Sequence, residues 1–181
     1  MKIIITLIII MFSFFTKGNA QYDQLASDFS FKNVEGSSIN LADYKGKVIL
    51  VVNVASRCGF TNQYKDLQAL WTKYKENDLL VIGVPSNNFR QEPGTNKEIK
   101  DFCETTFGIN FPITEKTDVI GSNSHPFFLW AKKNHGASAI PKWNFHKIII
   151  GRNGKVANTF TSITNPSSNK FISSIEKELK N

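Results

Sequence analysis

The fold of this chain is decided by residues 48 to 61, VILVVNVASRCGFT, which join an apolar strand to a cysteine. The residues from Val48 to Ala55 are nearly all apolar, as is typical of a strand buried on both faces of a sheet. The polar residues that follow bring Cys58 close to a second segment, Asn62 to Asn77, in which apolar side chains recur at helical spacing: Tyr64, Leu67, Leu70, Trp71 and Tyr74. The pattern predicts a buried strand that delivers a cysteine to the start of an amphipathic helix.

That position suits a reactive thiol. The unpaired amides and the positive dipole end of a helix N-terminus favour the thiolate, which is the nucleophilic form of cysteine. Arg57 adds a neighbouring cation and Gly59 a flexible neighbour. A lone cysteine is more often a small buried apolar residue, but its place beyond the strand end favours a catalytic role for Cys58. Thr61 stands where thioredoxins carry a second cysteine, so chemistry with one attacking thiol is favoured over C-x-x-C disulfide exchange.

The N-terminal residues predict a secretory signal peptide. Lys2 precedes a mostly apolar run from Ile3 to Phe15, and the small-residue stretch before Gln21 suits cleavage after residue 20. The run is shorter than the roughly 20 apolar residues that span a bilayer, so an exported protein is favoured over one with a retained anchor. The mature chain then has 181 − 20 = 161 residues, the size of one domain, and we expect residues 21–181 to form it.

The charge and cysteine content of the chain limit the kinds of partner and the kinds of disulfide that can be expected. The formal charge of +7 becomes +5 once Lys2 and Lys17 leave with the leader. The mature chain holds only three arginines, and its lysines are scattered, so a solvated surface is favoured over a nucleic-acid interface. Two cysteines, Cys58 and Cys103, are too few for a disulfide scaffold and form either one structural bridge or a redox couple.

The order of elements predicts an α/β chain with a thioredoxin-like fold. An alternating pattern from Phe29 to Leu41 predicts an N-terminal β-hairpin, and the apolar run from Leu79 to Val84 predicts a second strand, parallel to the first. Capping-box spacing at Thr95 to Glu98 opens a helix, and further helices are expected from His125 and near Pro166. A strand from Phe145 to Ile150 and a return from Val156 to Phe160, joined by a tight Asn-Gly turn, complete a central mixed sheet flanked by helices.

Several ordered motifs resemble the glutathione peroxidase family. They are NVASRCGFT at 53–61, QEPG at 91–94, KWNF at 142–145 and RNG at 152–154, and the resemblance covers about Phe29 to Leu179. It implies that Cys58 is the peroxidatic residue, with Gln91, Trp143 and Asn144 as its polar neighbours. Their N–H groups stabilise a thiolate and polarise a peroxide without reacting themselves. The implied activity is reduction of hydrogen peroxide and organic hydroperoxides through a sulfenic acid on Cys58.

Cys103 lies on the apolar face of its predicted helix, and pattern alone leaves a buried structural residue and a functional one equally open. Its surroundings, Phe102-Cys103 ahead of Phe107-Gly108 and Phe111-Pro112-Ile113, are similar to the resolving segment of the non-selenium, two-cysteine members that thioredoxin reduces. The resemblance implies that Cys103 resolves the sulfenic acid and that a thioredoxin-like protein is the reductant, with no cofactor. Direct reduction by glutathione and a non-enzymatic thioredoxin-fold binding module with a structural disulfide remain as alternatives.

The sequence departs from the family in two places. The family usually has two residues between a phenylalanine and its catalytic glutamine, whereas only Arg90 separates Phe89 from Gln91. The short link from His135 to Trp143 lacks the long insertion of tetrameric relatives, which implies a monomer. The three histidines, His125, His135 and His146, have no metal-ligand spacing with the cysteines, so no metal is expected, and a Cys58/His146 thiol protease is disfavoured because a papain-type context is absent.

Overall fold

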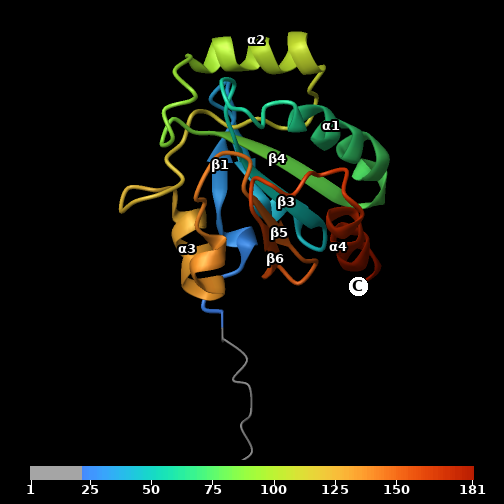
Figure 1. Ribbon diagram of the computed structural model, residues 1–181. Coiled ribbons are helices and arrows are strands. Elements are labelled where there is room, and N and C mark those ends of the chain that lie inside the picture. Colours follow the sequence, from blue (N-terminus) through green and yellow to red (C-terminus); the bar gives the residue numbers. More distant parts are fainter. Residues whose placement is uncertain (1–21) are drawn as a thin grey trace, which may run out of the picture.

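The computed structural model describes residues 22–181, so the predicted signal peptide lies outside the described residues. A four-stranded sheet of order β4-β3-β5-β6 forms its centre (Figure 1). β3 and β4 are parallel, and β5 runs antiparallel to both β3 and β6, which confirms the mixed sheet. The strands are β3 (Val48–Val54), β4 (Leu79–Pro85), β5 (Lys147–Ile150) and β6 (Val156–Phe160), with a separate hairpin of β1 (Ser30–Lys32) and β2 (Ser38–Asn40).

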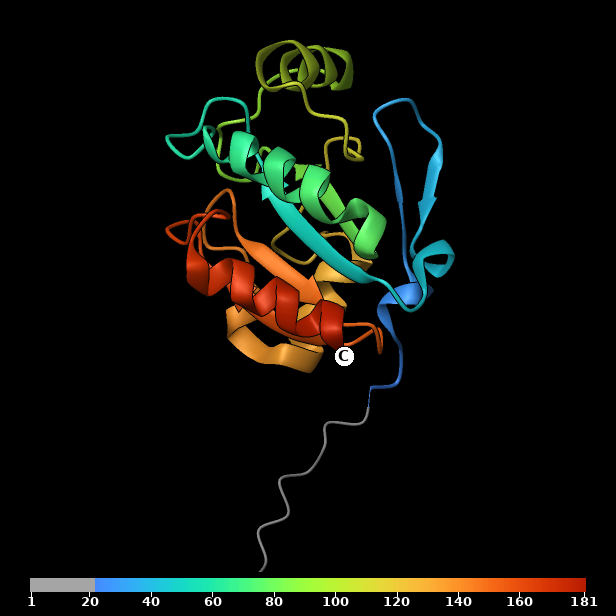
Figure 2. The same ribbon diagram turned by 90° about the vertical axis from the view of Figure 1, so that its right-hand side faces the viewer.

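Helices cover both faces of the sheet. Figures 1 and 2 show α1 and α4 side by side on one face, α3 on the opposite face, and α2 beyond one end of the sheet. The α-helices are α1 (Gln63–Tyr74), α2 (Asn96–Phe107), α3 (Pro126–His135) and α4 (Asn169–Lys180), and short 3-10 turns cover Ala26–Asp28, Leu41–Tyr44, Lys75–Asn77 and Gly136–Ala139. None of the helices within residues 22–181 has the length and apolarity that a bilayer crossing needs.

The core divides into two clusters, one on each face of the sheet. In β3, Leu50 and Val52 face the cluster that contains α1 and α4, while Ile49 and Val51 face the hairpin and α3. This alternation follows from the period of two in a strand, and it requires both sets to be apolar. The continuous apolar run that predicted β3 is therefore explained by burial on both faces.

The outer edge of β4 is covered by a short extended segment. The Gly83 N–H donates to the Pro112 carbonyl at 3.0 Å, and the Thr114 N–H donates to the Gly83 carbonyl at 2.9 Å. The approach requires glycine, because a Cβ at position 83 would lie 2.6 Å from Ile113 Cδ1. The segment that follows α2 is thereby fixed against the central sheet.

Local chemistry sets the helix boundaries. The predicted capping box of α2 is confirmed: the Glu98 carboxylate accepts from the Thr95 N–H at 2.7 Å, and Thr95 Oγ1 accepts from the Glu98 N–H at 3.3 Å. The helix ends at Gly108, whose φ of +61° is left-handed. Asn62, by contrast, makes no side-chain cap on α1.

Two expected element boundaries and one expected turn in the C-terminal part of the chain were wrong. β5 begins at Lys147 and not at Phe145, because Phe145 has a left-handed φ of +63° that no strand residue adopts. α4 begins at Asn169, after turns that start at Asn165. In the turn between β5 and β6 only Gly154 has a positive φ, so the two-residue Asn-Gly hairpin is replaced by a wider loop closed by the Gly151 N–H to the Lys155 carbonyl.

Candidate active site

Cys58 lies in the turn between β3 and α1, and its side chain is 8% exposed. Thr61 holds this turn from within: its Oγ1 accepts from the Cys58 N–H at 3.0 Å and lies 2.7 Å from the Cys58 carbonyl and 3.0 Å from the Ala55 carbonyl. The Phe60 N–H donates to Cys58 Sγ at 3.4 Å. The sulfur thus already accepts one backbone hydrogen bond, of the kind that stabilises a thiolate.

Gln91 lies next to the cysteine turn despite the shortened loop before it. Arg90 takes a left-handed φ of +59°, and its N–H donates to the Asn87 carbonyl at 2.9 Å, which turns the chain back. The Gln91 carbonyl then accepts from the Arg57 N–H at 3.0 Å. This tight turn brings the backbone of Gln91 to Arg57, the residue before Cys58.

Trp143 and Asn144 are brought to the same end of the sheet by Asn53, a polar residue inside β3. Asn53 Nδ2 donates to the Trp143 carbonyl at 3.2 Å, Asn53 Oδ1 accepts from the His146 N–H at 3.0 Å, and the Asn53 carbonyl accepts from the Phe145 N–H at 2.6 Å. The loop before β5 is thus tied to the strand that leads to Cys58.

The side chains of Gln91 and Asn144 bond directly to each other. Asn144 Nδ2 donates to Gln91 Oε1 at 2.8 Å, and Asn144 is fully buried with its Oδ1 unpartnered within residues 22–181. Trp143 is 42% exposed, and its ring lies 5.5 Å from that of Phe89. Gln91 Nε2 and Trp143 Nε1 donate to no other side chain or backbone group of the described residues. The four predicted catalytic residues thus lie at one end of the sheet. Gln91 and Asn144 bond through their side chains, Trp143 is held through its carbonyl, and Cys58 is linked to them through the backbone of Arg57.

Backbone strain is concentrated beside this network. Arg90 precedes Gln91, Phe145 follows Asn144, and both have a positive φ although neither is glycine. A left-handed residue with a side chain costs roughly 1 to 2 kcal/mol and persists only where surrounding contacts fix it. The fold therefore maintains unfavourable backbone conformations at the chain neighbours of the two bonded amides.

Arg90→Gly is expected to relieve one of these strains. The free energy of unfolding of Arg90→Gly should be about 1 kcal/mol higher than that of Arg57→Gly, because glycine adopts a positive φ without steric cost. Arg57 is the matched control, since it is an exposed arginine of the same region with an ordinary φ. Urea denaturation of both variants measures the difference, and equal midpoints would show that position 90 carries no strain.

Cys103 lies on α2, is fully buried and has a free thiol, as Cys58 does. Burial raises the pKa of the Cys103 thiol to about 11, although the nearby Tyr64 hydroxyl acts in the opposite direction. The Tyr64 hydroxyl is itself buried and makes no hydrogen bond of good geometry with the described residues. Cys103 is therefore held as a neutral thiol in an apolar environment.

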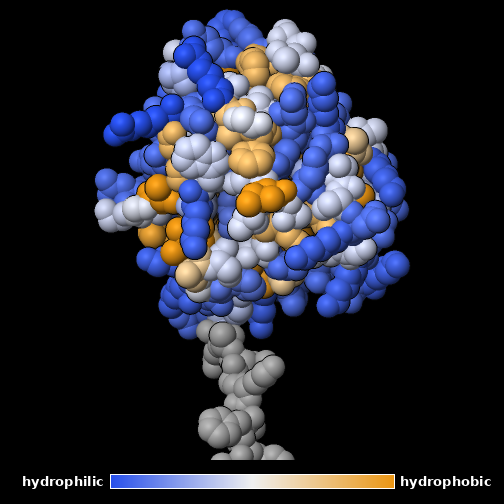
Figure 3. Space-filling view, viewed as in Figure 1, coloured by the Kyte–Doolittle hydropathy of each residue, from blue (hydrophilic) through white to orange (hydrophobic). Residues whose placement is uncertain are grey.

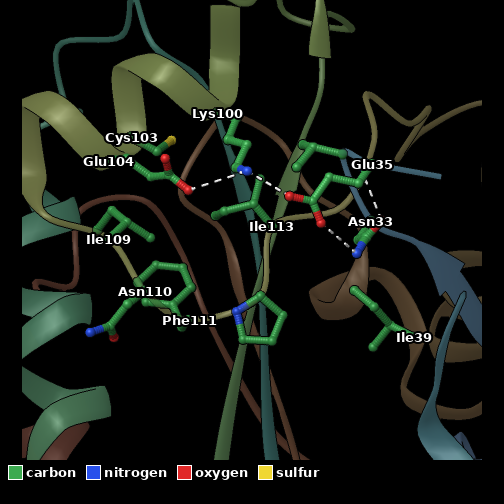
Figure 4. Close-up of a pocket in the computed structure, with 12 residues that line it drawn as sticks. Asn33, Glu35, Ile39, Lys100, Cys103, Glu104, Ile109, Asn110, Phe111 and Ile113 are labelled. Carbon is green, nitrogen blue, oxygen red and sulfur yellow. Dashed lines mark hydrogen bonds and ion pairs between the residues drawn. The ribbon is translucent and has the colours of Figure 1, made fainter. Parts of the chain in front are cut away.

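A cavity of about 280 Å³ lies beside Cys103, between α2 and the β1-β2 hairpin (Figure 4). Figure 4 shows Lys100 above it, where the Lys100 ammonium bonds to Glu35 at 2.5 Å and pairs with Glu104 at 3.7 Å. These ion pairs are largely exposed and contribute little to stability. The helix that carries Cys103 is thus attached to the hairpin by weak contacts next to open space.

His146 is buried and His125 is half-buried, and neither belongs to a cluster of metal-binding side chains within residues 22–181. His146 is buried, its pKa is lowered to about 4 by desolvation and by the Lys147 charge, and its Nε2 has no partner among the described residues. His125 caps α3 through Nδ1 and bonds the Ser30 carbonyl through Nε2. Within residues 22–181 no group of three or more His, Cys, Asp or Glu side chains could hold a metal ion.

Two residues of the network were not assigned a role from the sequence. Asn53 was placed only in the apolar strand, and Glu92 was only part of the QEPG motif. Both are buried polar side chains, at 1% exposure each. The available signal for Asn53 was its polarity within an otherwise apolar strand, because a buried polar group needs partners.

The thioredoxin-like fold, with a free cysteine just beyond β3 whose sulfur accepts a backbone N–H, is that of a thiol-dependent oxidoreductase. The chain belongs to the glutathione peroxidase family, whose model, described as glutathione peroxidase, matches residues 26–132.

Relatives and solved structures agree with this assignment. The hydroperoxy fatty acid reductase of Synechocystis sp. is 43% identical over 169 residues, which cover 88% of this chain and 99% of the relative. Glutathione peroxidase-like peroxiredoxin 2 of Saccharomyces cerevisiae is 44% identical, covering 78% and 90%. The crystal structure of Trgpx in its apo form is 34% identical with a TM-score of 0.70, covering 87% of this chain and 97% of that one.

Proposed function

We propose that this protein is a thiol peroxidase that reduces hydrogen peroxide and organic hydroperoxides to water or alcohols through Cys58. The single observation that supports the proposal best is the arrangement at Cys58, where a free sulfur accepts a backbone N–H and its turn is bonded to the Gln91 loop. Gln91, on that loop, and Asn144, in the loop before β5, bond to each other and are the side chains expected to hydrogen-bond during the reaction.

In the first step, the Cys58 thiolate attacks one oxygen of the O–O bond. A sulfenic acid forms on sulfur, and the other oxygen leaves as an alkoxide or hydroxide that takes up a proton. Gln91 Nε2 and Trp143 Nε1 are the donors proposed to stabilise the charge that develops on the leaving oxygen. Asn144 Nδ2 donates to Gln91 Oε1, which fixes the Gln91 amide and leaves its Nε2 hydrogens available to the leaving oxygen.

In the second step, Cys103 is proposed to attack the Cys58 sulfenic acid, so that a disulfide forms and water is released. A fully buried thiol whose pKa is raised to about 11 is a weak nucleophile. We therefore propose that α2 opens locally around Cys103. The weak exposed ion pairs of Lys100 and the adjacent cavity support this step.

A thioredoxin-like protein is the proposed reductant of this disulfide, which returns both cysteines to thiols. Relatives named glutathione peroxidase-like peroxiredoxin in Saccharomyces cerevisiae and Schizosaccharomyces pombe support this choice over glutathione. The deciding experiment measures peroxide turnover by the purified mature protein with a thioredoxin system and with glutathione at matched reducing equivalents. Turnover with thioredoxin is expected to be faster. Faster turnover with glutathione would favour the glutathione-dependent alternative, and no turnover with either would contradict the proposed activity.

On the face that Figure 3 shows, apolar side chains gather near the middle and hydrophilic ones surround them. Two large apolar side chains are exposed near the end of β3. Trp143 is 42% exposed, and Ile163, in the loop that follows β6, is 82% exposed. Trp143 lies before the start of β5, and Ile163 lies after the end of β6. Both positions are at the end of the sheet where β3 ends, because β5 runs antiparallel to β3 and β6 runs parallel to it. We propose that this surface accepts the apolar part of an organic hydroperoxide.

The remaining proposals concern the setting of the enzyme. We propose that the leader is removed after residue 20 and that the protein acts outside the cytoplasm. A monomer without nucleic-acid or stable membrane partners is proposed, and the short connection from His135 to Trp143, filled by the turn Gly136–Ala139, supports it. The free thiols of Cys58 and Cys103 favour the enzyme over the alternative of a binding module with a structural disulfide.

A further inference from the structure

Glu92 is a buried carboxylate that the proposed reaction does not use. It is 1% exposed, and its Oε2 accepts two hydrogen bonds from one residue, the Ser56 N–H at 2.8 Å and the Ser56 hydroxyl at 2.9 Å. Its own N–H donates to Asn87 Oδ1 at 3.0 Å, which fixes the backbone of Glu92 itself. Burial raises the pKa of Glu92, and the Ser56 hydrogen bonds counter part of this rise.

Gln91 and Glu92 attach their loop to the cysteine turn at two points. Gln91 accepts from Arg57 through its carbonyl, and Glu92 accepts from Ser56 through its carboxylate. Two consecutive residues of one loop therefore hold the two residues immediately before Cys58. Thr61 holds the turn from its other end.

Packing alone does not hold the cysteine turn on this side. A cleft of about 350 Å³ lies between the turn and the first turns of α2, and Ser56, Arg57 and Glu92 lie on one wall while Glu98, Ile99 and Phe102 lie on the other. Without the carboxylate, the segment before Cys58 would have room to move toward α2. Burying a carboxylate costs several kcal/mol unless hydrogen bonds offset it, so its retention here calls for a specific role.

We propose that Glu92 is a positioning residue that holds the Cys58 sulfur in its reactive place by fixing Ser56. The inference rests on the proposed peroxidase function. Displacing a reacting atom by about 1 Å can cost on the order of 100-fold in rate. Loss of the Ser56 attachment is therefore expected to slow oxidation of Cys58 in a protein that is still folded.

The experiment measures the second-order rate constant for Cys58 oxidation by hydrogen peroxide in a single turnover, well below the unfolding temperature of each variant. Glu92→Ala is expected to lower this constant by about 10-fold to 100-fold. Glu92→Gln keeps an oxygen acceptor of the same shape and is expected to stay within about threefold of the parent. Glu98→Ala and Glu98→Gln are the matched controls, since Glu98 lies across the same cleft, and both are expected to leave the constant unchanged.

Ser56→Ala provides a test that does not depend on how well Glu92→Ala folds. It removes only the hydroxyl donor, so an intermediate loss of about threefold to tenfold is expected, and combining it with Glu92→Ala should add little to the loss from Glu92→Ala alone. The inference is overturned if Glu92→Ala and Ser56→Ala both oxidise at the parent rate, or if Glu92→Gln falls as far as Glu92→Ala. A parent protein that does not react with peroxide would instead refute the proposed function.

Discussion

Cys58→Ser is expected to lower peroxide turnover by at least about a thousandfold, with the fold retained, because removing the nucleophile of a covalent mechanism leaves only residual catalysis. A hydroxyl is not ionised near neutral pH, whereas a thiolate is a strong nucleophile. The substitution is small, and the turn around position 58 is held by backbone bonds and by Thr61, none of which needs the sulfur.

The measurement is consumption of hydrogen peroxide with the thioredoxin system, accompanied by trapping of sulfenic acid with a dimedone-type reagent. Cys103→Ser is the control for this prediction, because it keeps Cys58 and should still consume one equivalent of peroxide. If sulfenic acid forms on Cys103 in the Cys58→Ser protein, Cys103 is the nucleophile and the prediction is contradicted.

Cys103→Ser is expected to slow steady-state turnover with the thioredoxin system by about 100-fold while the first equivalent of peroxide reacts at the parent rate. Without a resolving thiol the Cys58 sulfenic acid should persist after peroxide, and mass spectrometry should show a gain of one oxygen and no disulfide. Because position 103 is fully buried, Cys103→Ala is a second variant that avoids burying a hydroxyl.

Stability separates this expectation from a structural bridge. A disulfide contributes about 2 to 4 kcal/mol, so a structural Cys58–Cys103 bridge predicts that Cys103→Ala loses that amount under oxidising conditions. The peroxidase proposal instead predicts that the disulfide form loses hydrogen-exchange protection over 95–108 relative to the reduced form. Equal protection in the two forms would show that α2 does not open.

The helices and strands whose apolar residues are continuous or regularly spaced could be predicted from the sequence. β3, α1 and β4 could be predicted because each shows, in its own residues, the continuous or helix-spaced apolar pattern that burial in the core requires. The capping box of α2 was equally local, because Thr95 and Glu98 lie within one turn. The identity of Cys58 as the site cysteine depended on its place between a buried strand and a helix, and the structure has both elements there.

The connections within the site could not be predicted in the same way. The bonds of Asn53 to the loop before β5 and of Glu92 to Ser56 join residues far apart in the chain, and no local pattern encodes them. The left-handed backbone of Arg90 and Phe145 was also unforeseeable, because residues with large side chains normally avoid it. For this reason the strand expected from Phe145 was placed two residues too early.

The segment beside β4 has a consequence for how the protein behaves at high concentration. A bare strand edge offers unpaired N–H and C=O groups to which another molecule can add a strand, a common start of aggregation. Here residues 112–114 occupy that place at Gly83, and the close approach excludes any side chain at that position. The chain thus covers part of the β4 edge of its own sheet against strand addition by a second molecule.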